Sequence, residues 1–64
     1  MKNQMPMAEF QKYVISKAKL VISTYPEEKN AEKLAEIAFK DGLLADKTEA
    51  MAVWGRIKRE LRNG

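Results

Sequence analysis

Hydrophobic residues recur every three to four positions in the first third of the chain. This period predicts a helix over residues 7–23, with one apolar stripe that consists of Met7, Phe10, Val14, Ala18 and Val21. Four more apolar residues widen the stripe on both sides: Tyr13, Ile15, Leu20 and Ile22. Because a surface helix normally has a narrower apolar face, we expect neighbouring helices or a second copy of the chain to cover it. We therefore predict that these four residues form a homodimer interface.

A second helix is predicted over residues 26–41. Thr24 and Glu27 have the spacing of a capping box, in which Thr24 is the N-cap. Pro26 is suited to a first turn, where backbone donors are unpaired anyway, and Gly42 is the expected C-terminal stop. The residues expected to face inward are Ala31, Leu34, Ala35, Ile37 and Ala38.

A third helix is predicted over residues 47–62, after an apolar connector at 43–45 that must pack into the core. Asp46 and Glu49 repeat the capping pattern at its start. Its inner arc is predicted to consist of Ala50, Val53, Trp54, Ile57 and Leu61. No segment alternates with a period of two residues, so we predict no strand. The sequence therefore predicts that residues 1–64 form a single all-α domain, a compact three-helix structure.

The composition limits how such a small domain is stabilised. A chain of this length buries only about 60% of the surface that its unfolded form exposes. It contains no cysteine and no histidine, so disulfides are excluded and the usual zinc ligands are missing. We therefore expect stability to come from helix packing, from a partner or from both, and we expect no metal and no cofactor.

The same sequence bears on location and catalysis. No apolar run approaches the roughly 20 residues that cross a bilayer, and residues 1–10 lack the apolar stretch of a secretory signal. We expect a cytoplasmic protein without a membrane partner. The chain has no histidine for proton transfer near neutral pH and no cysteine that could act as a nucleophile. Its three glycines are far apart in the sequence and form no phosphate-binding loop. We expect that the chain is not an enzyme.

All of the net charge lies at one end of the chain. Residues 1–52 contain eight lysines and eight acidic residues, which cancel, whereas VWGRIKRELRNG at 53–64 contains four basic residues and one glutamate. This end alone therefore accounts for the net charge of +3. Cations near a helix C-terminus are favoured by the helix dipole, which is a purely structural explanation. The alternative is a binding surface.

The outward face of the third helix favours the binding surface. A helical wheel at about 100° per residue predicts that the face opposite the Trp54/Ile57 arc consists of Thr48, Met51, Ala52, Gly55, Arg59 and Arg62. The residues that flank this face are Lys47, Lys58 and Arg56. A glycine inside a helix costs about 1 kcal/mol relative to alanine, and no core contact requires one here. Gly55 is explained if a large partner approaches this face closely. A recognition helix in a DNA major groove has this distribution of apolar and basic residues.

The segments YPEEKNAEKLA and VWGRIKR resemble the second and third helices of a homeodomain. In that family a tyrosine-proline pair can precede helix two, a leucine of helix two packs inward, and helix three carries a core tryptophan followed by basic residues. The adenine-reading asparagine of the family corresponds to Ile57 here. The resemblance thus implies a homeodomain-like or helix-turn-helix-like fold, and DNA binding dominated by phosphate contacts rather than base recognition.

We therefore predict a small regulatory protein that binds duplex DNA. The predicted contact residues are Lys47, Thr48, Gly55, Arg56, Lys58, Arg59 and Arg62. The alternative is a small inhibitor or adaptor of the kind that phages and mobile elements encode, which docks the same basic helix on an acidic protein surface. Both functions use the same helix face.

Overall fold

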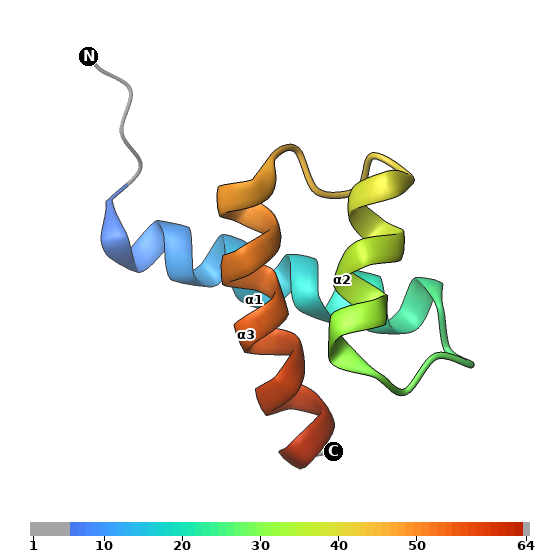
Figure 1. Ribbon diagram of the computed structural model, residues 1–64. Coiled ribbons are helices and arrows are strands. Elements are labelled where there is room, and N and C mark those ends of the chain that lie inside the picture. Colours follow the sequence, from blue (N-terminus) through green and yellow to red (C-terminus); the bar gives the residue numbers. More distant parts are fainter. Residues whose placement is uncertain (1–5, 64) are drawn as a thin grey trace.

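The computed structural model describes residues 6–63, which form three helices and contain no strand. The helices are α1 (Met7–Thr24), α2 (Ala31–Lys40) and α3 (Lys47–Asn63). The helices α2 and α3 lie side by side and run in opposite directions, and α1 crosses behind both (Figure 1). The predicted all-α, three-helix architecture is confirmed. No helix of the described residues has the length and apolar character needed to cross a bilayer.

The start of α2 differs from the prediction. Thr24 does not cap α2, because it is the last residue of α1 and its hydroxyl donates to the carbonyl of Leu20 at 2.7 Å. The N-cap is Asn30, whose side chain accepts a hydrogen bond from the backbone N–H of Lys33 at 3.1 Å. The helical conformation is disfavoured for a residue that precedes proline, and α1 accordingly ends before Tyr25. Residues 25–30 therefore form a linker.

The other two helix ends follow the predicted pattern. At the end of α2, Gly42 has φ of 87°, a left-handed conformation that suits glycine. The next N–H, that of Leu43, donates to the carbonyl of Ala38 at 2.8 Å, which together with the Gly42 to Phe39 bond forms a Schellman motif. At the start of α3, the side chain of Asp46 accepts a hydrogen bond from the N–H of Glu49 at 2.8 Å. These interactions stop α2 and start α3 within a short connector.

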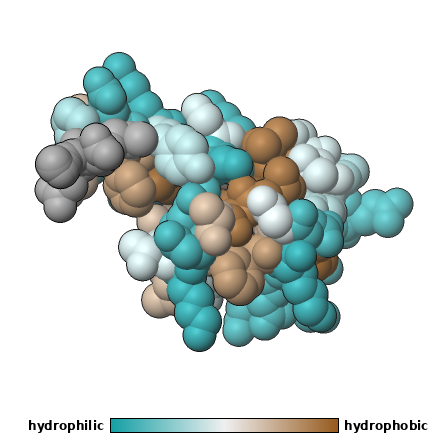
Figure 2. All heavy atoms as spheres, turned by 90° about the horizontal axis from the view of Figure 1, so that it is seen from above, coloured by the Kyte–Doolittle hydropathy of each residue, from teal (hydrophilic) through white to brown (hydrophobic). Residues whose placement is uncertain are grey.

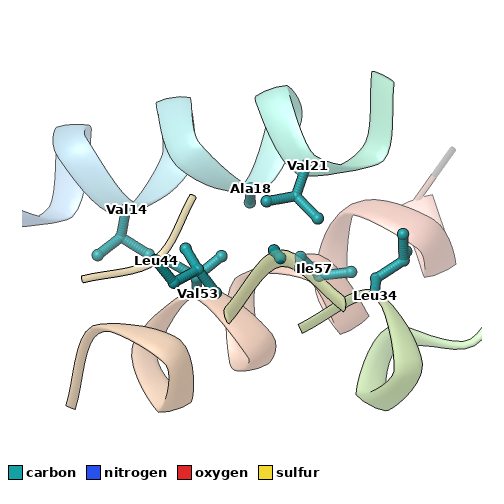
Figure 3. Close-up of a cluster of buried hydrophobic side chains, with 8 residues drawn as sticks. Val14, Ala18, Val21, Leu34, Leu44, Val53 and Ile57 are labelled. Carbon is teal, nitrogen blue, oxygen red and sulfur yellow. The ribbon is translucent and has the colours of Figure 1, made fainter. Parts of the chain in front are cut away.

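The core is a cluster of aliphatic side chains between α1 and the other two helices (Figure 3). Its buried residues are Val14, Ala18, Val21, Leu34, Ala38, Leu44, Val53 and Ile57. The connector contributes Leu44, only 1% of which is exposed, so it packs into the core as predicted. Figure 2 looks down on the end of the molecule that carries this connector, where hydrophobic side chains gather between hydrophilic ones.

Three polar contacts join segments that are far apart in the sequence. The Tyr13 hydroxyl of α1 donates to Glu49 Oε2 of α3 at 2.7 Å. Lys17 Nζ donates to the Leu43 carbonyl at 2.7 Å and thereby fastens the connector to α1. The Tyr25 hydroxyl donates to Asp41 Oδ2 at 2.6 Å and joins the residues that follow α1 and α2.

The Tyr13 contact predicts a loss of stability in alkaline solution. The hydrogen bond to the Glu49 carboxylate raises the pKa of Tyr13 above its ordinary value of 10.0, and partial burial and the charges of Glu49 and Asp46 add to this effect. A raised pKa means that the folded state holds the proton more tightly than the unfolded state. The contribution of Tyr13 is therefore complete below the ordinary pKa and is lost as the pH rises through the pKa of the folded state.

Urea denaturation of the wild type and Tyr13→Phe, from neutral to alkaline pH, measures this contribution. The difference in the free energy of unfolding between them should shrink as the pH rises above about 10. Because every other ionisable group is the same in both proteins, its effect cancels in the difference. A difference that stays constant with pH would show that the hydrogen bond from the Tyr13 hydroxyl to Glu49 does not stabilise the folded state.

Candidate nucleic-acid interface

The third helix turns one face to the core and the opposite face to solvent. Val53 and Ile57 are 0% exposed and fix the rotation of α3 about its axis. With that rotation, Gly55, Arg59 and Arg62 are exposed on the outer side of the helix. The predicted outward direction of these three residues is confirmed. Two other residues predicted on this face lie elsewhere: Ala52 packs against the core, and Met51 lines the groove between α2 and α3 together with Trp54.

A hollow of about 440 Å³ lies over Gly55. The side chains around it are those of Arg56, Lys58, Arg59 and Arg62. A Cβ atom built on Gly55 would meet nothing within 4 Å, so no packing contact within the described residues requires glycine there. The structure thus brings five of the seven predicted nucleic-acid-binding residues around one exposed point of the backbone.

Arg56 differs from the other three cations because it already has a partner. Its Nη2 lies 2.6 Å from Glu60 Oε2 and its Nε donates to the same oxygen at 2.8 Å, and both side chains are less than one-third exposed. This pair neutralises the charge of Arg56. This ion pair could have been predicted from the sequence, because Arg56 and Glu60 have the i,i+4 spacing of helical ion pairs. The cations available at the hollow are Lys58, Arg59 and Arg62.

The position of Trp54 corrects the prediction that it is a core residue. Its side chain is half-buried and lies outside the cluster of buried residues. It lines the groove between α2 and α3, and Lys58 Nζ lies 5.2 Å from the centre of its ring. A cation over an indole face is an attractive arrangement. Trp54 therefore helps to place one of the cations of the hollow.

The two remaining predicted contacts, Lys47 and Thr48, are exposed in the first turn of α3. At 1.5 Å per residue, eight helical positions separate Lys47 from Gly55 by about 12 Å along the axis. Neither residue lines the Gly55 hollow, and Lys47 instead lines the α2–α3 groove. The predicted set of seven is thus divided between two places.

The residues of α1 predicted as a dimer interface also fall in different environments. Tyr13 is bonded to Glu49, and Ile22 packs against the buried cluster. Ile15 is half-buried, whereas Leu20 is 44% exposed. Contacts within the chain therefore account for much of the apolar excess of α1, and Leu20 is the most exposed of the four.

Comparison of this chain with models of known protein families, with curated proteins and with solved structures found no match.

Proposed function

We propose that this protein binds duplex DNA by presenting the outer face of α3 to the phosphate backbone. The observation that carries the proposal is the exposed Gly55, with no neighbouring atom at its Cβ position and three available cations around it. A glycine allows a large partner to approach the helix backbone, and the cations Lys58, Arg59 and Arg62 then contact phosphates. The protein would act as a small regulatory DNA-binding protein.

The expected mode of binding is electrostatic. Arg59 and Arg62 are one helical turn apart and point in similar directions, so both can contact one strand of a groove. In the homeodomains that this chain resembles, an asparagine reads an adenine base, and Ile57 stands at the corresponding position here. Ile57 is 0% exposed and cannot reach a base. Phosphate contacts position a protein on DNA but carry no direct sequence information. We expect an affinity that depends strongly on salt and little on sequence.

The salt dependence of binding tests the role of the two arginines. Each lost phosphate contact should reduce the slope of log K against log salt concentration by about 0.9 in magnitude. We expect this reduction for Arg59→Ala and for Arg62→Ala, measured by fluorescence anisotropy with a labelled duplex.

Lys12→Ala is the matched control, because it also removes one positive charge but from an exposed position on α1. Its slope should equal that of the wild type. If all three variants have the same slope, net charge rather than the α3 face determines binding. If the wild type fails to bind any duplex at low salt, DNA is not the ligand, and an acidic protein surface becomes the partner to test.

A further inference from the structure

A second candidate surface is the groove between α2 and α3. Its volume is about 340 Å³, and its largest apolar lining residues are Phe39, Met51 and Trp54. Met51 is 64% exposed and Phe39 is 40% exposed, so both belong to the four exposed large hydrophobic residues of the part of the chain that the structure describes, together with Met7 and Leu20. No residue of α1 lines the groove. Exposed apolar side chains that adjoin one another, unlike single scattered ones, can mark an interaction surface.

The two margins of the groove carry opposite charges. Glu32 and Glu36 lie on the α2 side, and Lys47 lies on the α3 side. Lys58 extends the basic margin towards the end of α3, where it lines a hollow together with Glu32 and Trp54. Within residues 6–63, none of these four charged side chains forms an ion pair. Their charges are therefore free to pair with a partner that lies over the groove.

A surface with one acidic and one basic margin is complementary to itself. The helices α2 and α3 are antiparallel neighbours (Figure 1), so a twofold axis parallel to them places α2 of one copy over α3 of the other. This rotation brings the glutamates of each copy over the lysines of its partner, and it brings the apolar residues of both grooves together. A twofold axis perpendicular to the helices and lying in the same plane would instead place α2 over α2, with like charges opposed.

We propose that a second copy of this chain covers the α2–α3 groove and forms a twofold homodimer through Phe39, Met51 and Trp54. Such an interface is isologous, because each copy contributes the same surface. It is separate from the α1 surface that the sequence predicts, and it does not rest on DNA binding.

Sedimentation velocity of the full chain, over a concentration series up to the millimolar range, tests this proposal. The wild type should shift from the monomer mass of 7.3 kDa to twice that value. Met51→Glu should remain a monomer throughout, because it places a carboxylate among the apolar residues of the interface. Since Trp54 is the only tryptophan and lies in the groove, its fluorescence emission should shift to longer wavelength as the wild type is diluted.

Leu20→Glu is the matched control, because it makes the same kind of change at an exposed apolar residue of α1. It should dimerise like the wild type. Glu36→Lys and Lys47→Glu should each weaken the dimer, and the double variant should recover it. A wild type that remains monomeric, or a dimer that Leu20→Glu breaks and Met51→Glu leaves intact, would overturn the proposal. Circular dichroism of every variant verifies that the helices remain folded.

Discussion

Gly55→Glu should abolish the binding of duplex DNA and leave the protein folded. The fold tolerates the substitution because nothing lies within 4 Å of the Cβ position, and glutamate favours a helix interior over glycine by about 0.5 kcal/mol. Binding is lost for two reasons. The new side chain occupies the point of closest approach, and its carboxylate can pair with Lys58 or Arg59 at i,i+3 and i,i+4 spacing.

Fluorescence anisotropy at low salt measures the loss of binding, and a thermal melt followed by circular dichroism verifies the fold. Two further variants separate the causes. Gly55→Gln adds the same bulk without the charge and should weaken binding to an intermediate level. Gly55→Ala adds one methyl group, so it should stabilise the helix by up to about 1 kcal/mol and retain binding. If the Gly55→Glu protein binds DNA like the wild type, the face of α3 around Gly55 is not the DNA-binding surface.

Ile57→Ala should leave most of the protein unfolded. Ile57 is 0% exposed and belongs to the cluster that joins the three helices. Truncating a buried isoleucine to alanine costs about 2–5 kcal/mol, whereas the core of so small a domain rarely supplies more than about 3–5 kcal/mol in total. Loss of helical signal in the far-ultraviolet circular dichroism spectrum measures the effect.

Ile15→Ala and Trp54→Ala are the comparisons for this experiment. Ile15→Ala deletes the same atoms from a half-buried position of α1, so it should cost less. Trp54 lies in the groove, outside the buried cluster, so Trp54→Ala should keep a cooperative melt at a lower temperature. If Trp54→Ala unfolds the protein more than Ile57→Ala does, the stability of the domain depends on the groove rather than on the cluster.

The helix count and most helix ends could be predicted because local patterns determine them. The hydrophobic period locates α1 and α3, whose observed ends lie within one residue of the prediction. The sequence predicts the start of α2 at residue 26, but the helix begins at Ala31. The prediction is wrong because Thr24 and Asn30 are both good N-cap residues and the pattern favours the earlier one. The residues between Pro26 and Asn30 are all charged and offer no apolar period that could decide between them.

The sequence predicts which face of α3 carries Gly55, but it does not predict how far each residue of the inner arc is buried. A helical wheel assigns Val53, Trp54 and Ile57 to one arc, yet Val53 and Ile57 enter the core whereas Trp54 lies at its edge. The difference depends on how α2 packs against α3, which the pattern of a single helix does not contain. The outward position of Gly55 depends only on the rotation of α3, and the wheel therefore predicts it correctly.

The connector between α2 and α3 has a consequence for how sequences of this fold can diverge. Loops generally accept insertions and deletions more readily than helices do. Here Leu44 is part of the core and the Leu43 carbonyl is bonded to Lys17, so an inserted residue would displace both. In the linker between Thr24 and Ala31, Tyr25 packs against the core and is hydrogen-bonded to Asp41, whereas residues 26–29 include no fully buried residue. In relatives of this chain, we expect changes of length to accumulate in that linker, and the spacing from Ala38 to Lys47 to stay constant.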